Sequence, residues 1–325
     1  MKAIDNWYTA NFKEKIEIAN KLVKNQSTKL KKIENVVAVG YGRREKNGQL
    51  TNEVCIKISV SQKKNSKELF FGGIPQYVLT TCVNSDGVRR AYAVPTDVTE
   101  LSDLKLQGGI GGSATLSRRG NYGENGTVCC YVKFFGYNNY YALGCAHTFA
   151  LISRLNKPPI RDFINNVTYS QNADGSIRGN LGYLQVIGAL NKVDAAVVSV
   201  TDFQELSSGF GDNNYAFNGI SNDLYSNNYL IHTRRGSFEI DWVENIKRLS
   251  LTYHVNQNSK TYTFNNIIRS LVLRGQTLAG DSGSPITTFN GELLAMHFAG
   301  DGTHSYALPI QQVFNAFNPP LNLAT

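Results

Sequence analysis

The chain has 325 residues, about the length of two ordinary domains. Its hydrophobic fraction of 42% and charged fraction of 18% allow a sizeable buried core and exclude a disordered chain. No apolar run reaches the ~18–20 residues of a membrane helix, and the charged N-terminus lacks the apolar stretch of a signal peptide. The sequence therefore predicts neither a membrane span nor export.

Positive charge is concentrated in the first third of the chain. The formal net charge is +8, and residues 1–104 alone hold 17 basic and 11 acidic side chains, a net charge of +6. Much of this charge lies between Lys21 and Lys32, in a stretch with neither interleaved aromatic residues nor a known nucleic-acid motif. We interpret it as the solvated face of a helix and expect no nucleic-acid binding.

The number and spacing of the cysteines indicate a reducing compartment. The chain has five cysteines, an odd number, and no export signal, so we expect free, mostly buried thiols and a cytoplasmic location. No CxxC pair occurs, and the Cys145-Ala146-His147 stretch lacks the second pair of ligands that a structural zinc site needs. The sequence predicts no metal and no cofactor.

Residues 7–34 predict a helical region, because apolar residues recur near a 3.6-residue period among lysines and glutamates. Residues 36–44 and 52–60 then have the pattern of strands, and the Asn47-Gly48 pair between them predicts a hairpin. A second pair of strands, 75–83 and 87–98, follows. We therefore expect residues 1–104 to form a small α+β domain with an N-terminal basic helix.

A flexible glycine-rich segment predicts the boundary between two domains; it contains Gly108, Gly109, Gly111 and Gly112. From residue 105 to 325 the chain consists of short β-rich runs separated by clusters of Gly, Asn, Ser and Asp, with no helices alternating between them. This spacing is typical of an antiparallel sandwich or barrel. Only residues 310–317 have a helical pattern.

The stretch AGDSGSP, residues 279–285, carries the clearest chemical signal. A serine hydroxyl is a poor nucleophile near neutral pH and needs a base, together with backbone N–H donors aimed at the developing oxyanion. Glycines around Ser282 let the Gly280 and Ser282 amides converge. The alternative interpretation is a polar β-turn, since turns use the same residue types.

Two further residues complete the pattern. His147 ends the run GCAH, and Asp194 opens the apolar strand DAAVV. Taken alone, His147 could be an ordinary core or surface residue, and Asp194 could simply cap a turn. Their order, His then Asp then Ser282, is the order of a chymotrypsin-type triad.

With these motifs, residues 105–325 resemble the chymotrypsin/trypsin-like serine peptidases. GCAHT stands where that family has its histidine motif, VDAAVV where it has its aspartate motif, and GDSGSP is its nucleophile motif unchanged. The resemblance implies a chymotrypsin-like double antiparallel β-barrel. The first third, with VVAVGYG and PTDVTE, is loosely similar to the N-terminal domain of bacterial and plant trypsin-like proteins of the narrow-leaf type.

The resemblance also implies a role for each residue. Ser282 would be the nucleophile and His147 the general base and then the general acid. Asp194 would fix the tautomer of His147 and stabilise its imidazolium, while the Gly280 and Ser282 amides would form the oxyanion hole. Cys145 is interpreted as a small buried filler.

The resemblance also implies which residues form the primary specificity pocket. Gln276, six residues before Ser282, would stand at the base of the pocket in place of an acidic residue, so we do not expect cleavage after Lys or Arg. Thr277 and His297 are arranged as in glutamyl endopeptidases, and both can donate hydrogen bonds to a carboxylate or amide oxygen. Glu before the scissile bond is thus expected, with Gln or Asp next. Alternatively, His297 is a buried strand histidine bonded to a carbonyl.

Together these features predict a mainly β intracellular serine endopeptidase whose N-terminal domain, residues 1–104, is regulatory or targeting. Its partners would be a protein or peptide substrate and a regulatory protein or ligand at that domain. The architecture suggests regulated cleavage in stress or defence signalling. The alternative function is a catalytically silent protease fold that acts as a protein-interaction module.

Overall fold

The computed structural model describes residues 2–63, 73–83, 87–101, 105–106, 115–118, 125–149, 166–170, 179–187, 193–200, 217–223, 225, 228–233, 235–255 and 258–324. The glycine-rich boundary segment of residues 108–112 lies outside these ranges. The chain forms two compact units, which we call unit 1 (residues 1–103, 243–250 and 265–269) and unit 2 (the remainder). Strands dominate both units, so the prediction of a mainly β fold is confirmed.

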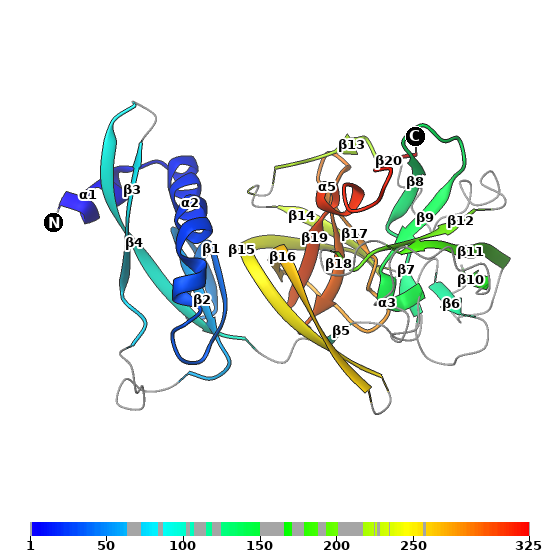
Figure 1. Cartoon of the computed structure of the whole chain (residues 1–325), viewed down its shortest axis with the longest axis horizontal. Helices are drawn as coiled ribbons and strands as arrows, with labels where there is room; N and C mark the ends of the chain where they lie inside the picture. The colour runs from blue at the N-terminus through cyan, green and yellow to red at the C-terminus, as the bar shows by residue number, and fades with distance from the viewer. Residues whose placement is uncertain are drawn as a thin grey trace. The chain divides into compact units, whose positions relative to one another are not determined.

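Unit 1 is a mixed sheet with two helices (Figure 1). Its strands run in the order β15, β1, β2, β4, β3; β2 and β4 are parallel, and the other neighbours are antiparallel. Asn47 and Gly48 join β1 to β2 with positive φ, as the hairpin prediction requires. The elements are α1 (Lys2–Thr9), α2 (Phe12–Leu30), β1 (Val36–Lys46), β2 (Gln49–Val60), β3 (Tyr77–Val83) and β4 (Arg89–Glu100).

The helix α2 packs on β1 and β2 through the apolar stripe that the sequence indicates. Its buried side chains are Ile16, Ile18, Ala19, Leu22, Val23 and Leu30. The predicted single helical region is in fact two helices, because Asn11 is extended and its side chain accepts a hydrogen bond from the Glu14 N–H. That contact starts a new helix by capping its first turn.

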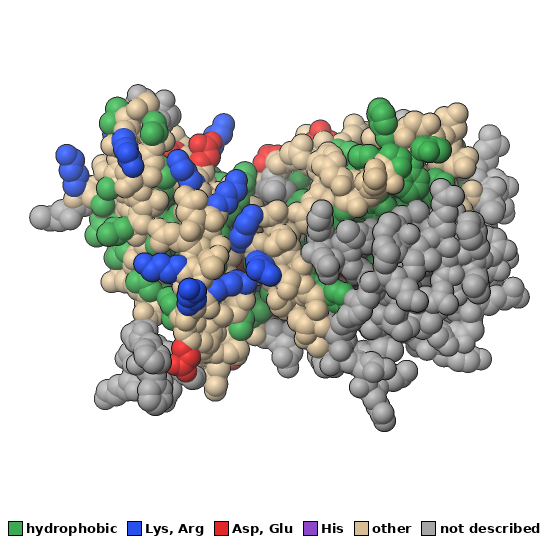
Figure 2. Space-filling view, in the orientation of Figure 1, with side chains coloured by type: hydrophobic (Ala, Val, Ile, Leu, Met, Phe, Trp, Pro, Cys, Tyr) green, Lys and Arg blue, Asp and Glu red, His purple; other side chains and the backbone are tan. Residues whose placement is uncertain are grey.

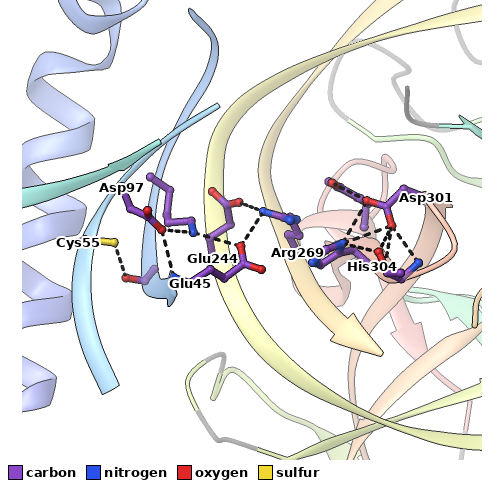
Figure 3. A network of polar contacts seen from close by, with 11 residues as sticks. Glu45, Cys55, Asp97, Glu244, Arg269, Asp301 and His304 are labelled. Carbon is purple, nitrogen blue, oxygen red and sulfur yellow. Dashed lines mark hydrogen bonds and ion pairs between the residues drawn. The ribbon is translucent and has the colours of Figure 1, made fainter. Parts of the chain in front are cut away.

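Unit 1 takes in two strand segments from far along the chain, residues 243–250 of β15 (Gly236–Val255) and 265–269 of β16 (Asn258–Val272). A buried charge cluster joins them to the N-terminal strands (Figure 3). Arg269 pairs with Glu244 at 2.7 Å and with Glu45 of β1 at 3.7 Å, and Lys57 pairs with Asp97 at 2.6 Å and with Glu45 at 3.3 Å. Burial disfavours the charged Lys57, yet Glu244 and Asp97 outweigh it and raise its pKa.

Unit 2 contains an eight-stranded antiparallel sheet in the order β20, β8, β9, β12, β11, β10, β6, β7. These strands supply two of the three candidate triad residues from the connections beside β9 and β12. Their bounds are β6 (Thr115–Arg118), β7 (Asn125–Thr127), β8 (Cys130–Phe134), β9 (Tyr141–Gly144), β10 (Asn166–Ser170), β11 (Gly179–Ile187), β12 (Ala196–Ser199) and β20 (Leu321–Leu323).

The other strands of unit 2 follow the path β14, β17, β18, β19, β16, β15, and β15 pairs again with β14. The path therefore closes into a barrel, as the resemblance implies. The short strands β5 and β13 pair with the two ends of β18. The bounds are β5 (Lys105–Leu106), β13 (Gly219–Ile220), β14 (Tyr229–Thr233), β17 (Pro285–Thr288), β18 (Glu292–Gly300) and β19 (His304–Pro309), with the helices α3 (Ala146–Phe149) and α5 (Ile310–Phe314).

Large aromatic side chains fill the core of this barrel; Trp242, Tyr229, Phe264, Phe298 and Tyr306 are all fully or almost fully buried. The predicted C-terminal helix is shorter than its pattern, because α5 ends at Phe314 and a turn follows. Among the described residues, no helix is long and apolar enough to cross a membrane.

Candidate active site

The pairing of β9 with β12 brings the predicted histidine and aspartate together. The two strands are antiparallel with Gly144 opposite Ala196. His147 follows the end of β9, in the short helix α3, and Asp194 precedes the start of β12. Residues just beyond the paired ends of antiparallel strands are neighbours, so 47 positions of sequence separation become a direct contact.

Asp194 holds His147 through both carboxylate oxygens. Oδ2 lies 2.5 Å from the ring Nδ1, and Oδ1 accepts the backbone N–H of His147 at 3.0 Å. The carboxylate is fully buried and the imidazole nearly so. Because an ionised carboxylate only accepts hydrogen bonds, this contact places the imidazole proton on Nδ1 and leaves Nε2 as an acceptor.

Ser282 faces that acceptor. Its Oγ lies 3.0 Å from His147 Nε2, and 3.1 Å from the carbonyl oxygen of Phe298. The serine is fully buried. The hydroxyl proton therefore has two acceptors, one of which is a nitrogen that can remove it.

The turn that carries Ser282 is held from several sides. Thr127 donates its N–H to the Ser282 carbonyl at 2.7 Å and its hydroxyl to the Gly280 carbonyl at 2.9 Å. Gly280 and Gly283 have φ of +98° and +100°, which favours glycine. A Cβ at Gly283 would lie 1.8 Å from the Thr127 carbonyl oxygen, so the glycine is also required by this close approach.

The predicted pocket residues have different environments. Gln276 is exposed, whereas Thr277 is buried and its hydroxyl lies 3.4 Å from the His304 carbonyl. His297 is fully buried, and its Nδ1 lies 2.8 Å from the Ser305 hydroxyl. Thr277 and His297 thus contact adjacent residues at the start of β19.

The environment of His297 favours the neutral form of its imidazole. Burial, and secondarily the charge of His147, lower the pKa of His297 to about 3. The imidazole is therefore neutral near pH 7. Its backbone nevertheless borders the serine turn, since its carbonyl accepts the Gly283 N–H at 2.8 Å and its N–H donates to Ser284 at 2.9 Å.

Cys145 lies beside the candidate triad. Its sulfur donates to the His297 carbonyl at 3.4 Å, and burial raises the thiol pKa well above its ordinary value. Donor atoms of Cys145, His147 and Asp194 lie within 4.8 Å of one another, which is close enough for a metal. The Nδ1 atom of His147 is already engaged by Asp194, however, and the thiol resists the deprotonation that metal binding needs.

Three contacts at this site were not predicted from the sequence. Thr127 contacts the Gly280 carbonyl, and Ser305 contacts His297. The third contact joins Arg235 to the Asp281 carboxylate, with their atoms 2.7 Å apart. None belongs to a motif, and each joins residues that only the folded barrel brings together. The Arg234-Arg235 pair was visible in the sequence, but nothing in it indicated a partner 46 residues away.

No family model matches this chain, and no curated protein matches it. Similar solved structures are proteases at low similarity. The Rv3671c protease in an inactive form aligns with a TM-score of 0.31 and 12% identity over 57% of this chain and 85% of that one. The serine protease of a human pathogenic astrovirus aligns with a TM-score of 0.30 and 16% identity over 60% of this chain and 87% of that one. The HtrA-type protease AlgW with a decapeptide aligns with a TM-score of 0.29 and 13% identity over 92% of this chain and 64% of that one. Because these three TM-scores are well under 0.5, the function proposed below rests on the side chains of this chain.

Proposed function

We propose that the chain is a serine endopeptidase that uses Ser282, His147 and Asp194. The observation that carries this proposal is the continuous pair of contacts from the Asp194 carboxylate to His147 Nδ1, and from His147 Nε2 to Ser282 Oγ. The Asp194 contact sets the tautomer in which the second nitrogen can act as a base. A buried Ser–His–Asp chain of this geometry is suited to acyl transfer.

The reaction follows from these positions. Ser282 Oγ attacks the carbonyl carbon of the scissile peptide bond while its proton passes to His147 Nε2. The imidazolium, stabilised by the Asp194 carboxylate, then gives that proton to the leaving amine and an acyl-enzyme ester remains. Water, deprotonated by the same nitrogen, hydrolyses the ester and restores Ser282.

The backbone of the serine turn supports an oxyanion hole. The amides of Asp281, Gly283 and Ser284 donate to carbonyls within the fold. For the Gly280 and Ser282 amides, no acceptor is found among the described residues. Two N–H groups beside the nucleophile that have no acceptor in the described part of the chain could serve as the donors that a developing oxyanion needs.

A cysteine mechanism fits less well, although Cys145 is close to His147. The atom that faces His147 Nε2 is Ser282 Oγ, and the Cys145 thiol donates to a carbonyl instead. The thiolate is the nucleophilic form, and burial raises the pKa of this thiol. We therefore assign the nucleophile to Ser282.

We also propose that the residue before the scissile bond is Gln or Glu, with Asp less favoured, and that Gln276, Thr277 and His297 line the pocket. Binding Glu by a charged His297 would require its protonation; with a pKa of about 3, this costs about 5 kcal/mol at pH 7. A neutral imidazole whose Nδ1 is held by Ser305 can still donate from Nε2 to the amide oxygen of Gln. We therefore propose that Gln ranks above Glu, in contrast to the order expected from the sequence.

Unit 1 is proposed to regulate or target the peptidase through a protein or ligand that binds it. The support is the continuity of β15 and β16, each of which contributes residues to both units. The five cysteines are free and buried, which supports the proposed cytoplasmic location.

The test is labelling by a fluorophosphonate, which reacts with activated serines. We expect the wild-type chain to be labelled and the Ser282→Ala variant to be silent. Ser284→Ala is the matched control, since the Ser284 hydroxyl has no hydrogen-bond partner among the described residues and should be dispensable. His147→Ala should also abolish labelling. A wild-type chain that is folded but unlabelled would support the catalytically silent interaction module instead.

A further inference from the structure

The strand β3 ends the sheet of unit 1, so one of its two sides has no neighbouring strand (Figure 1). Its seven residues, Tyr77–Val83, include no charged residue, no proline and no glycine, and no bulge interrupts its register with β4. Edge strands usually carry a charge, a proline or a bulge, which prevents another chain from pairing with them. Because β3 has none of these features, its open side can accept a further strand.

The pairing with β4 determines which backbone groups of β3 point to the open side. Opposite residues of antiparallel strands alternate between pairs that exchange hydrogen bonds and pairs that do not. The Thr96 N–H donates to the Gln76 carbonyl at 3.0 Å, which makes these two residues a bonded pair, and the next residue of β4, Pro95, has no N–H to give. Counting on from this pair, the peptide groups of Leu79 and Thr81 point away from β4.

Most of these outward groups have no partner. The Leu79 carbonyl accepts the side-chain amide of Gln26, from α2, at 3.0 Å, which agrees with its outward direction. For the Leu79 N–H, and for the N–H and carbonyl of Thr81, no partner is found among the described residues. Backbone groups that lack a partner in the fold must bond to water or to another chain. These groups are therefore available for a ladder of hydrogen bonds with an added strand.

The side chains of β3 provide an apolar surface beside this edge. Val78 and Cys82 are buried on one face of the strand. On the other face, Leu79 and Val83 are 67% and 59% exposed, with the exposed Thr81 between them. An added strand places alternate side chains against this face, and apolar pairs across neighbouring strands stabilise the contact.

Charge indicates which kind of strand fits this edge. Unit 1 holds 20 basic and 12 acidic residues, a net charge of +8, and several of the acidic side chains are already paired inside the unit. The exposed Arg89 lies opposite Val83, and the exposed Lys29 follows Gln26 by about one helical turn. Neither cation has an ion-pair partner among the described residues. Two copies of this unit repel each other, whereas an acidic segment is attracted.

We propose that the open side of β3 binds an extended, acidic segment of a partner protein, which joins the sheet of unit 1 as an added strand. The inference deepens the partner-binding role proposed for unit 1, and it does not require the peptidase activity. Hydrogen bonds to the Thr81 backbone set the register of the segment. Leu79 and Val83 select apolar side chains four positions apart, and the net positive charge of the unit disfavours basic segments.

The experiment measures binding of a synthetic peptide to the full-length chain with Ser282→Ala, so that no peptidase activity digests the probe. The peptide Glu-Glu-Val-Thr-Thr-Thr-Val-Glu-Glu, blocked at both ends, should reach saturation below about 1 mM. The analogue with lysine in place of each glutamate should bind at least about tenfold more weakly. Binding should protect the Leu79 and Thr81 amides from hydrogen exchange followed by NMR, while the Thr80 amide, which points to β4, should change little.

Thr81→Pro tests the backbone contact, because it removes an N–H that makes no bond to β4. Proline is tolerated on an edge strand where the missing N–H faces solvent, so this variant should fold. It should bind the acidic peptide at least about tenfold more weakly. Val37→Ser is the matched control and should bind like its parent, since it truncates an exposed side chain of β1, which β2 and β4 separate from β3. If Thr81→Pro fails to fold, Leu79→Ser with Val83→Ser should weaken binding by a similar factor.

Several results would overturn the proposal: no binding, equal binding of the two peptides, or parental affinity in the folded Thr81→Pro or double-serine chain. Self-association of the chain without peptide, if Thr81→Pro abolished it, would show that a second copy occupies the edge and would overturn the acidic partner. The peptidase is tested separately. A folded wild-type chain that the fluorophosphonate does not label would overturn the proposed function and leave the peptide result unchanged.

Discussion

His147 and His297 lie close enough for the charge of one to lower the pKa of the other, yet their partners differ. His147 faces a carboxylate, which stabilises an imidazolium, whereas the Nδ1 atom of His297 lies beside the uncharged Ser305 hydroxyl. A positive charge is therefore accommodated at His147 and opposed at His297. One imidazole is suited to carry the reaction's proton, and the other to remain a neutral hydrogen-bond donor.

Asp194→Asn tests the role assigned to the buried carboxylate. The amide can donate to His147 Nδ1, which would move the imidazole proton to Nε2 and remove the acceptor that Ser282 needs. We expect the maximal rate of labelling by the fluorophosphonate to fall on the order of 10⁴-fold while the unfolding transition stays cooperative. Labelling within tenfold of the wild type would contradict the assignment of Asp194.

The state of His297 gives a prediction about substrate choice. A peptide library that varies the residue before the scissile bond should rank Gln above Glu, with Lys and Arg poor. His297→Leu should reduce kcat/KM for the Gln substrate by about 10- to 100-fold, the scale of one hydrogen bond to a buried group, and by less than threefold for Ala. A library that prefers Arg, Phe or Ala would refute the pocket but not the triad.

For single residues, the sequence predicted those that belong to motifs, but not the residues and the environment that hold them in place. His147, Asp194 and Ser282 were predicted to act together, and they are within hydrogen-bonding distance. The protonation of His297 could not be predicted, because it depends on complete burial in β18. Arg235 could not be predicted either, since an ion pair across 46 residues leaves no local pattern.

Among the elements, β1 and β15 approach each other unusually closely within unit 1. Gly40 and Gly42 of β1 lie against Ile246 and Glu244 of β15 in the antiparallel register. A Cβ at Gly42 would lie 2.1 Å from the Val243 carbonyl oxygen, and one at Gly40 would lie 2.4 Å from the Asn245 carbonyl oxygen. These glycines are needed for close backbone approach.

Gly42→Ala should therefore weaken unit 1. The added methyl cannot fit without displacing β15, and overpacking of this kind typically costs about 1–3 kcal/mol. The chain has two tryptophans, Trp7 in unit 1 and Trp242 in unit 2, so Trp242→Phe leaves a fluorescence reporter of unit 1. Urea unfolding of Gly42→Ala in the Trp242→Phe background should show this loss in the free energy of unfolding. Val37→Ala on the same strand is the control and should lower that free energy less. Unchanged stability would mean that this pairing does not form.

The strands β15 and β16 belong to both units, which their sequence patterns could not predict. Their patterns were typical of barrel strands, and both do serve the barrel of unit 2. Nothing in the pattern indicated that 243–250 and 265–269 also join unit 1, because alternation reports which residues are buried and not against which partner. In the sequence alone, Glu244 and Arg269 cannot be distinguished from ordinary charged residues of a strand, because their pairing becomes apparent only in the fold.

At the scale of the whole molecule, the net positive charge belongs to unit 1. With the strand segments included, unit 1 holds 20 basic and 12 acidic residues, a net charge of +8, and unit 2 holds 13 of each. Figure 2 shows lysine and arginine side chains gathered over α2. Long-range attraction of an anionic partner would therefore act on unit 1, while the proposed peptidase unit is neutral overall.

The stability of unit 2 should depend on pH through histidines that are buried in their neutral form. His232 lies 2.8 Å from both the Ser237 and the Thr287 hydroxyls, linking β14, β15 and β17 of the barrel, and burial lowers its pKa to about 4. The unfolded chain binds a proton at this histidine near its ordinary pKa of 6.5, but the folded chain does not until about pH 4. Acidification between these values therefore favours the unfolded state.

His232→Gln should flatten this dependence. In the wild type, His232 alone should lower the free energy of unfolding of unit 2 by about 3 kcal/mol between pH 7.5 and pH 4, in addition to the effect of His297. The glutamine retains hydrogen-bonding groups for the two hydroxyls but cannot take up a proton, so the variant should lose some stability at pH 7.5 and less on acidification. Urea unfolding followed by Trp242 fluorescence, with Trp7→Phe to remove the other reporter and Ser282→Ala to prevent self-digestion, measures both effects. Parallel pH profiles for the variant and its parent would show that His232 is already charged in the folded barrel or equally buried in the unfolded chain.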